Sequence, residues 1–372
     1  MKKVLCLLLG SLCLAISACA PAEQAKSSPL VHSETLGSWE ELSLRLQKDG
    51  FDAEKTEKLF ADVGMPPSLS PMGTKIRELY SNKFLPKPKP KARPASVSKR
   101  KKSPPSALGI PGPWFKGTVT RANALKCKEF IKSNSKAFAE AEKKYGVPAE
   151  VGAALLFVET RLGTFLGSQN AFYALASMSV KRSPESMAHY LDELPGTWSR
   201  LDWIDERMEE KSEWAYEELK ALLEYCWSNG KDPLSIPGSI YGAIGLCQFM
   251  PSNIKRFAED GNGDGMIDLF SAPDAILSLS RYLSLNGWKK GINLKGQVDV
   301  LMRYNRMRTY AHTILALAKT IENLDTPVKH KASKAVRNKA KSSMKKSSKG
   351  KIPAQKKRWV SAKGRDVTAF ID

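Results

Sequence analysis

Residues 145–163 read YGVPAEVGAALLFVETRLG and predict a buried helix with defined ends. Pro148 stands where a first-turn proline is tolerated, and Glu150 follows it near the positive end of the helix dipole. Gly163 is a typical helix stop. The apolar run from Val151 to Val158 is too short to span a membrane, so we expect it to lie in a protein core.

One carboxylate, Glu159, closes this apolar run and is followed by Arg161. A carboxyl group beside buried surface should have a raised pKa, because desolvation disfavours its charged form. A general acid that works near neutral pH needs such a pKa. Glu159 is therefore a candidate catalytic acid. The alternative is an ion pair of Glu159 with Arg161 or a lysine, since ion pairs also perturb pKa values.

Helical spacing of apolar residues recurs along the chain, while almost no stretch alternates with a period of two. We therefore predict an all-α or mostly α fold. Besides the helix at 145–163, we expect helices over residues 122–144, 203–227, 298–307 and 309–321, and a loop or short helix at 172–180. The helix over 122–144 should bury Phe130, Ile131, Phe138 and Ala141.

The net charge of +21 lies almost entirely outside the predicted globular body. Nine basic residues and no acid occur from Lys83 to Lys102, and fifteen basic against two acidic residues occur from Lys329 to Asp372. Subtracting both segments leaves −1 for the rest of the chain. A near-neutral body argues against a basic docking face, so we expect no nucleic-acid partner.

Composition divides the chain into six segments. They are a signal peptide at 1–18, a tether at 19–37, a small helical region at 38–84, a Pro- and Lys-rich extended linker at 85–105, the body at 106–326, and a basic disordered tail at 327–372. We interpret the region at 38–84 as a helical pair that docks on the body.

The first residues predict export. Met1–Lys3 is a positive n-region, and Val4–Ala15 is an apolar h-region too short for a stable span. The Ile-Ser-Ala-Cys that follows resembles the bacterial lipoprotein signal, in which cleavage precedes a lipid-bearing cysteine, here Cys19. Ala20 resembles the class sorted to the outer membrane, which would place the protein on its periplasmic face. The alternative is an ordinary secretory signal cut near the same position.

Three cysteines remain after the predicted cleavage, Cys127, Cys226 and Cys247. One disulfide is permitted in an exported protein, and the spacing leaves its pairing open. None of the three has metal-ligand spacing, and the four histidines form no HExxH motif, so we expect no zinc site.

A second informative stretch, residues 238–252, reads GSIYGAIGLCQFMPS. Its three glycines would let the backbone approach a ligand. Ser239 and Gln248 offer hydrogen-bonding side chains, and Phe249 and Met250 suit the face of a sugar. The alternative is a loop whose glycines serve packing alone.

These two stretches together resemble the membrane-bound lytic transglycosylase B family. The resemblance rests on YGVP and VETR in the first stretch and GAIGLCQFMPS in the second, and it covers roughly residues 145–318. Three later pieces continue it in the family's order: 260–270, which begins DGNGDG; 274–288, with RYL and NGW; and 303–311, with RYNR and YA. The resemblance implies a lysozyme-like catalytic domain over 106–326.

The piece at 260–271 also matches the start of an EF-hand loop. Oxygen donors occupy alternate positions and Gly265 is sixth, but Ser271 replaces the glutamate expected at the twelfth position. The family's loop is extended and closed by a later aspartate. The resemblance therefore implies a structural Ca²⁺ site formed by Asp260, Asn262, Asp264, the Met266 carbonyl and Asp274. The alternative is a Gly- and Asp-rich turn without a metal.

The resemblance implies cleavage of the β-1,4 bond between N-acetylmuramic acid and N-acetylglucosamine in peptidoglycan. The muramyl C6 hydroxyl attacks C1 and leaves a 1,6-anhydro sugar, with Glu159 as acid and then base and with no organic cofactor. Ser239 would contact the substrate near the scissile bond, and Gln248 would orient Glu159 or the sugar. Phe249, Tyr282 and Tyr304 would line the cleft, with Asn305 beside them.

The sequence offers other carboxylates and two other functions. Glu150 and Glu224 are interpreted as surface or ion-pair residues, which leaves Glu159 as the single acid in the matching motifs. One rival is a peptidoglycan-binding lipoprotein scaffold without catalysis. The other is an exported protein that binds nucleic acid or lipopolysaccharide through its basic tail. We expect the tail instead to hold the enzyme to anionic cell-wall polymers.

Overall fold

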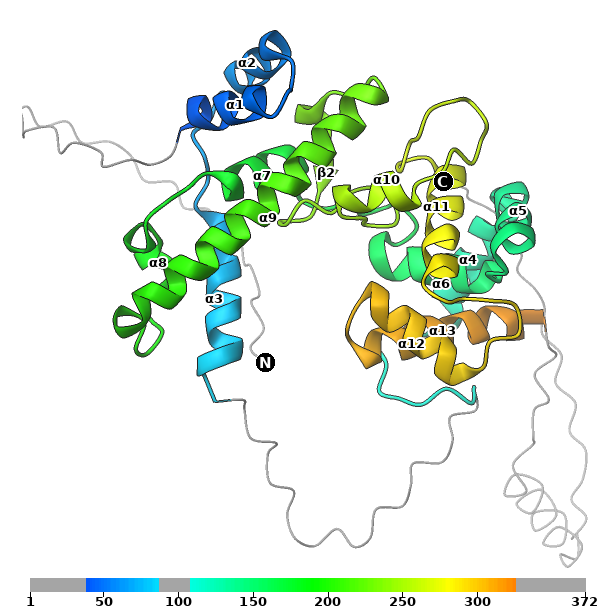
Figure 1. Ribbon diagram of the computed structural model, residues 1–372. Coiled ribbons are helices and arrows are strands. Elements are labelled where there is room, and N and C mark those ends of the chain that lie inside the picture. Colours follow the sequence, from blue (N-terminus) through cyan, green and yellow to red (C-terminus); the bar gives the residue numbers. More distant parts are fainter. Residues whose placement is uncertain (1–37, 87–107, 326–372) are drawn as a thin grey trace, which may run out of the picture.

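The computed structural model describes residues 38–86 and 108–325, which form a mostly helical protein (Figure 1). The predicted signal peptide with Cys19, the tether, the linker from residue 87 and the basic tail lie outside the described residues. One two-stranded antiparallel sheet occurs in the described part, with Gln169 of β1 (Gln169–Asn170) opposite Gly238 of β2 (Pro237–Gly238). The predicted mostly α class is confirmed.

Two groups of helices make up the described residues (Figure 1). The first, which we call the α9 lobe, packs on the longest helix. It contains α1 (Trp39–Lys48), α2 (Ala53–Asp62), α3 (Ser70–Phe84), α7 (Ala171–Ser179), α8 (Ala188–Leu191) and α9 (Leu201–Ser228).

The second group, which we call the α6 lobe, surrounds the helix predicted first from the sequence. It contains α4 (Arg121–Ser133), α5 (Ser135–Tyr145), α6 (Ala149–Thr160), α10 (Ile254–Phe257), α11 (Ala272–Leu285), α12 (Leu294–Tyr304) and α13 (Arg308–Glu322). Every residue of α6 from Val151 to Phe157 is buried, as its apolar run predicts, and α4, α5, α11 and α13 pack around it.

The ends of α6 differ from the prediction. Pro148 is the residue before the helix, and the helix ends at Thr160 rather than at Gly163. Arg161 and Leu162 adopt left-handed φ angles of 52° and 64°. The Leu162 N–H donates to the Leu156 carbonyl at 3.1 Å, which closes the helix with a turn usually made by glycine.

The long helix predicted over 122–144 is wrong, because it is broken at Asn134 into α4 and α5. The Asn134 side chain donates to the Phe130 carbonyl at 2.9 Å, and such a local bond competes with helix continuation. Phe138 and Ala141 are buried as expected, whereas Phe130 and Ile131 are only half-buried.

The predicted helical pair at 38–84 is three helices, and it docks on the body as expected. Phe60 of α2 packs on Phe172 of α7, with ring centroids 5.5 Å apart. Arg45 of α1 pairs with Glu213 of α9 at 2.5 Å. The buried Tyr80 of α3 donates to the Pro195 carbonyl at 2.8 Å. Aromatic burial and specific polar contacts therefore hold this region to the α9 lobe.

All three cysteines of the described residues are free and buried. The disulfide that the sequence permits is therefore not formed among Cys127, Cys226 and Cys247, which lie in α4, α9 and the glycine-rich loop at 238–252. Burial raises the pKa of each thiol to about 12. In the described part of the chain no helix has both the length and the apolar character to cross a membrane.

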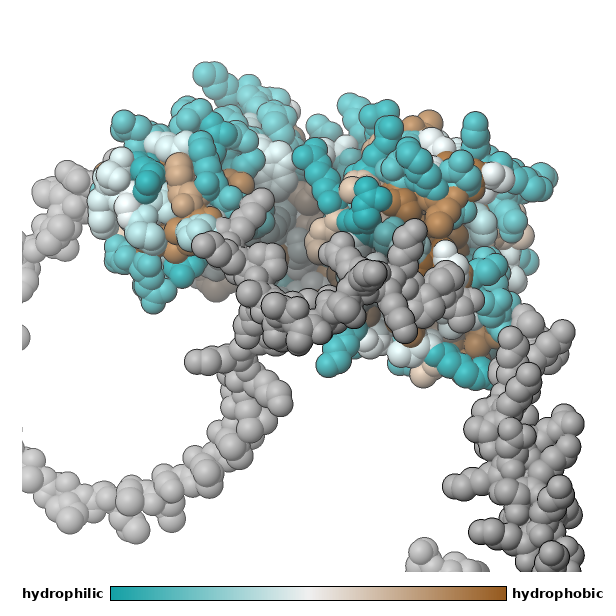
Figure 2. All heavy atoms as spheres, turned by 90° about the horizontal axis from the view of Figure 1, so that it is seen from below, coloured by the Kyte–Doolittle hydropathy of each residue, from teal (hydrophilic) through white to brown (hydrophobic). Residues whose placement is uncertain are grey.

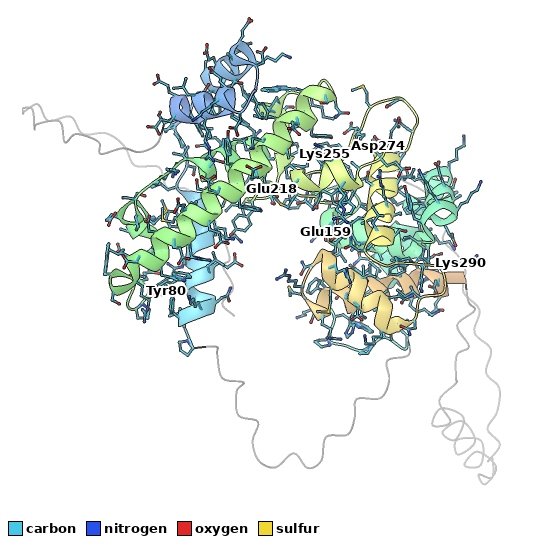
Figure 3. All side chains as sticks on the ribbon, viewed as in Figure 1. Tyr80, Glu159, Glu218, Lys255, Asp274 and Lys290 are labelled. Atoms are coloured by element: carbon cyan, nitrogen blue, oxygen red, sulfur yellow. The ribbon has the colours of Figure 1, made fainter. Side chains whose placement is uncertain are left out.

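Seen from below, the described surface is hollowed between the two lobes (Figure 2). Apolar side chains gather on the neighbouring face of the α6 lobe, the lobe that contains α12 and α13 (Figure 2). Glu159 lies on the side of the α6 lobe that faces the α9 lobe (Figure 3).

Candidate active site

Glu159 is the second-to-last residue of α6 and is half-buried. Burial raises the pKa of Glu159 to about 7, as its sequence context predicts, and a hydrogen bond from the Tyr310 hydroxyl to Oε1 opposes that rise. Arg161 is exposed and forms no ion pair with Glu159 in the described part of the chain. The ion-pair alternative therefore finds no support here.

The groups around Glu159 are neutral at pH 7. Burial raises the pKa of Tyr304 and of Tyr310 well above the ordinary tyrosine value, and the charge on Glu159 adds to both rises. The same charge adds to the raised pKa of Cys247. The Tyr304 and Tyr310 rings stack with centroids 6.4 Å apart and planes 12° apart. Glu159 is therefore desolvated, and the hydroxyl and thiol groups next to it keep their protons.

Thr160 joins the end of α6 to the glycine-rich loop. Its hydroxyl donates to the Leu246 carbonyl at 2.9 Å and accepts from the Gly163 N–H at 3.0 Å. Both bonds come from the residue next to Glu159, so the position of the carboxyl group is tied to the loop. The sequence does not identify Thr160 as a site residue, because nothing in its local pattern distinguishes it from other threonines at helix ends.

Gln248 connects the same loop to the segment that follows α6. Its amide nitrogen donates to the carbonyls of Gly245 at 3.1 Å and Leu166 at 3.3 Å, from a backbone with a left-handed φ of 49°. Within the described residues no hydrogen bond joins Gln248 to Glu159. Gln248 thus holds two main-chain segments near the carboxyl group.

The glycine-rich loop approaches protein rather than leaving open space. A Cβ at Gly242 would lie 2.4 Å from Leu175, and one at Gly245 would lie 2.6 Å from Leu269. The Ser239 hydroxyl accepts from the N–H groups of Tyr241 at 3.3 Å and Ala243 at 3.0 Å. The expectation that the glycines admit a ligand is therefore corrected: they admit neighbouring side chains, and Ser239 shapes the turn.

The predicted aromatic residues are brought together, but not all of them reach the surface. Phe249 is 2% exposed, so the expectation that it lines the cleft is wrong in this structure. It lies behind Tyr282 and Tyr304, whose ring centroids are 5.7 Å and 6.1 Å from its own. Tyr282 and Tyr304 are half-buried, and Asn305 is exposed at the end of α12. Phe249 supports the two tyrosines from the core.

Tyr310 contacts the carboxyl group of Glu159, and sequence reasoning missed this contact. The sequence presents Tyr310 only as part of the YA piece, yet its hydroxyl donates to Glu159. It belongs to the buried face of α13, where aromatic residues are more often core than catalytic, so no local pattern distinguishes it.

Other carboxylates do not compete with Glu159. Glu224 is exposed and Glu150 is half-buried. Glu218 of α9 is 5% exposed, but its two oxygens accept from the N–H and the hydroxyl of Ser252, both at 2.8 Å (Figure 3). Glu218 therefore caps the helical turn at Pro251–Asn253, which explains its burial.

The loop at 260–274 folds around its acidic side chains. Asp260 accepts from the N–H groups of Gly263 at 2.6 Å and Gly265 at 2.8 Å. Asp274, which is fully buried, accepts from Gly261 at 3.0 Å and Asp268 at 2.7 Å and so joins the two ends of the loop. No group of three or more His, Cys, Asp or Glu residues placed to hold a metal occurs within the described ranges.

Known proteins share this architecture. Residues 36–300 match the family described as the transglycosylase SLT domain. Membrane-bound lytic murein transglycosylase B of Escherichia coli (strain K12) is 32% identical over 191 residues, which are 50% of this chain and 45% of that protein. The match therefore spans less than half the length of this relative.

Solved structures agree with the same fold. The Escherichia coli lytic transglycosylase SLT35, known in complexes with bulgecin A and with calcium, superposes with TM-scores of 0.54 and 0.52 at 20% identity, over 80% of this chain and 98% of that one. SltB3 of Pseudomonas aeruginosa, solved with NAG-NAM-pentapeptide and with NAG-anhNAM-pentapeptide, gives 0.52 at 17% identity over 76% of this chain and 78% of its own. From the match over 36–300, this chain belongs to the transglycosylase SLT domain family.

Proposed function

We propose that this protein is a peptidoglycan lytic transglycosylase that cleaves the β-1,4 bond between N-acetylmuramic acid and N-acetylglucosamine and forms 1,6-anhydro-N-acetylmuramic acid. The observation that carries the proposal is a single carboxyl group, Glu159, with a pKa of about 7 in a transglycosylase SLT domain. The NAG-anhNAM-pentapeptide bound by SltB3 is the kind of product that such cleavage leaves.

Glu159 alone supplies both proton transfers. At neutral pH a large fraction of Glu159 is protonated, so it can donate to the glycosidic oxygen as the bond from C1 breaks. The resulting carboxylate accepts the Tyr310 hydrogen bond. It then takes the proton of the muramyl C6 hydroxyl as that oxygen bonds to C1. The proton returns to Glu159, no water is consumed, and the enzyme regains its starting state.

The surroundings of Glu159 favour this scheme over hydrolysis. Glycosidases with two carboxylates place them about 5 Å apart, or about 6.5–9.5 Å apart with a water between. The groups of the described chain whose pKa values Glu159 raises are Tyr304, Tyr310 and Cys247, and none of them is a carboxylate. A nucleophile from the substrate removes the need for a second carboxylate.

Mass spectrometry of purified peptidoglycan digested with the protein tests the proposal. Muropeptides about 18 Da lighter than their hydrolysed counterparts are expected, because each anhydro end lacks one water. Ordinary reducing ends would identify a hydrolase instead. Retained binding without cleavage would favour the scaffold.

Tyr310→Phe tests the partner of the acid. The reaction starts from protonated Glu159, so kcat/KM should fall as pH rises through about 7. Tyr310 lowers the pKa of Glu159, so its removal should move this alkaline limb to higher pH. The maximal rate should drop about tenfold, because a hydrogen bond to a charged group is lost. The measurement is the pH profile of anhydro-product release.

Tyr282→Phe is the matched control, because its hydroxyl donates to the Arg303 carbonyl at 3.0 Å and not to Glu159. Its alkaline limb should coincide with that of the parent protein. Coincident limbs for Tyr310→Phe and the parent would show that Tyr310 does not tune the acid.

We also propose that the loop at 260–274 binds Ca²⁺. Its donors are all oxygens, from Asp260, Asn262, Asp264 and the Met266 carbonyl, and they fit a hard cation. The Asp260 and Asp264 carboxylates both accept main-chain N–H groups of the loop, so the chain already curls around them. Asp274 would hold the far end of the loop.

Calcium should therefore raise the melting temperature. At 100 times the dissociation constant a bound ion adds about 2.7 kcal/mol to the free energy of unfolding. The gain should vanish with a chelator and be much smaller with Asp264→Asn, which removes one carboxylate from the set. Asp299→Asn, an exposed change outside the loop, should keep the full gain. A calcium-independent melting temperature in the parent protein would contradict the site.

The predicted anchor and tail belong to the same proposal. Cys19 would carry the lipid that places the enzyme on the periplasmic face of the outer membrane, and the tail from residue 327 would bind anionic cell-wall polymers. Cys19→Ala should release the protein from the membrane fraction. Truncation near Thr326 should reduce its co-sedimentation with cell walls.

A further inference from the structure

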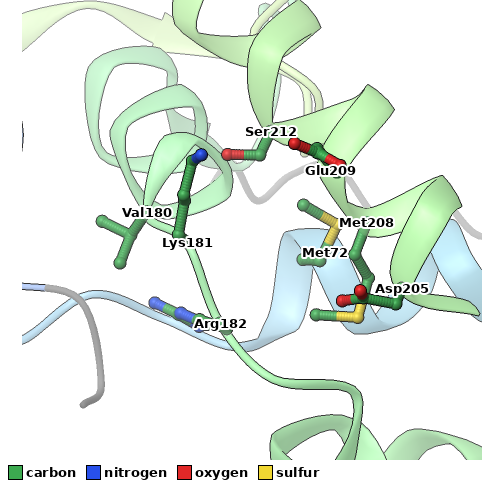
Figure 4. Close-up of a pocket in the computed structure, with 8 residues that line it drawn as sticks. All are labelled: Met72, Val180, Lys181, Arg182, Asp205, Met208, Glu209 and Ser212. Carbon is green, nitrogen blue, oxygen red and sulfur yellow. The ribbon is translucent and has the colours of Figure 1, made fainter.

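A pocket of about 200 Å³ opens on the α9 lobe, in a different lobe from Glu159. Its walls come from α3, from the segment after α7, and from α9 (Figure 4). Lys181 and Arg182 stand on the segment after α7, and Asp205 and Glu209 stand on α9 across from them (Figure 4). The pocket thus carries both signs of charge on opposite walls.

The basic wall holds a cation without a counter-charge. Arg182 donates through Nη1 to the Ser68 carbonyl at 2.9 Å, but its Nε is buried and has no partner. Burial lowers the pKa of Arg182 to about 10, and the described residues give it no ion pair. A desolvated guanidinium without a carboxylate is unfavourable. The Arg182 side chain points away from α9, whereas Lys181 points toward it (Figure 4). Lys181 is exposed and has no ion pair among the described residues, so it is the cation that a carboxylate in the pocket would meet.

The acidic wall is unpaired in the same way. Asp205 and Glu209 are exposed, make no ion pair in the described chain, and lie four residues apart on one helix face, where like charges repel. The charges next to them are paired, since Arg207 contacts both Glu206 and Glu210. Asp205 and Glu209 thus have no cation partner among the described residues, as is also the case for Asp202 and Glu224 of the same helix.

The floor between the two walls is apolar. Met72 of α3 is 2% exposed and Met208 of α9 is 3% exposed, and both line the pocket. Methionine adapts to small aliphatic groups. Lys181 also lines a second pocket of about 330 Å³ that continues along α9 to Arg45 and Glu213. A ligand that enters the first pocket therefore has room to extend beyond it.

We propose that this pocket binds a short peptide with a free carboxylate and a free ammonium group. The carboxylate pairs with Lys181, the ammonium group lies against Asp205 and Glu209, and aliphatic side chains cover the methionines. A pocket of about 200 Å³ is below the usual range of about 300–1,000 Å³ for drug-sized ligands, which suits a short peptide with small side chains. The site does not depend on the chemistry proposed for Glu159.

Methyl NMR of the full-length protein with ¹³C-labelled methionine tests the proposal. Trialanine is the probe, and Met72→Leu and Met208→Leu assign the two signals. Both signals should shift with saturation in the millimolar range. N-acetyl-trialanine and trialanine amide, which each lack one charge, should bind at least tenfold more weakly. Equal shifts with the capped peptides, or the same shifts with acetate alone, would overturn the proposal.

Variants on the exposed face of α9 avoid disturbing the core. The double variant Asp205→Asn and Glu209→Gln should weaken trialanine binding about tenfold or more, whereas Glu206→Gln, on the same helix but outside the pocket, should not change it. Equal binding by the double variant and the parent would refute the role of the acidic wall. Glu159→Gln should bind trialanine normally, so failure of the proposed cleavage and failure of this site give different results.

Discussion

Glu159→Gln should give a folded protein that releases anhydro-muropeptides at least about 10²–10⁴ times more slowly than the parent. The amide has nearly the shape of the carboxyl group and can still accept the Tyr310 hydrogen bond, but it can neither donate the first proton nor accept the second. The measurement is the initial rate of product release at pH 6 with equal protein amounts.

Glu224→Gln is the control, since Glu224 is the exposed acid that competes by sequence alone. It should keep full activity. Activity of Glu159→Gln within a factor of two of the parent would end the proposal that Glu159 is the acid.

Glu159→Gln should also be more stable than the parent protein at alkaline pH. The pKa of Glu159 is raised from 4.5 to about 7, so its charged form disfavours the folded state. Below pH 4.5 the group is protonated in both states and costs nothing. The loss in free energy of unfolding caused by ionised Glu159 grows between pH 4.5 and 7 and then stays constant. It is at most about 3 kcal/mol, and less because the half-buried side chain is partly screened by solvent. Thermal unfolding of both proteins at pH 4, 6 and 8 measures this difference.

Gly167→Ala should cause the largest loss of stability among single substitutions near the site. Gly167 has a left-handed φ of 113°, and a Cβ there would lie 2.0 Å from the carbonyl oxygen of Gly238 in β2. Both the backbone strain and the main-chain clash must be relieved by separating β1 from β2. We expect a loss of at least about 3 kcal/mol in the free energy of unfolding. Activity should fall with it, because Gly238 opens the glycine-rich loop.

Gly230→Ala isolates the clash from the strain. Gly230 also has a left-handed φ, 62°, but no atom lies within 4 Å of its would-be Cβ. Gly230→Ala should lower the free energy of unfolding by about 1 kcal/mol. Equal losses for the two variants, measured by chemical unfolding, would show that the approach of Gly167 to Gly238 does not matter.

The sequence predicted what depends on local pattern. The apolar run of α6 required burial, and a carboxyl group at its end required a raised pKa, so Glu159 was found from neighbours along the chain. The break at Asn134 and the left-handed pair Arg161 and Leu162 were not found. Non-glycine residues rarely adopt such angles, and only tertiary contacts make them favourable.

Residues that meet across the fold were harder to place. Tyr310 lies 151 positions from Glu159, and no spacing rule joins them. By residue type alone, Phe249 fits the face of a sugar and a protein core equally well, and the structure places it in the core. Gly242 and Gly245 permit close approach, as their residue type predicts, but the residues that approach them are Leu175 and Leu269. The order of residues along the chain does not show which side chain packs against a given glycine.

The reaction rates of the three buried thiols report how often the folded protein opens. A thiol with a pKa of about 12 is ionised to only about one part in 10⁴ at pH 8, so an alkylating reagent reacts with the native chain almost solely through excursions that expose sulfur. Cys127, Cys226 and Cys247 sit in the α6 lobe, the α9 lobe and the glycine-rich loop. Comparing the labelling rates of the three cysteines would show whether the two lobes open independently or together.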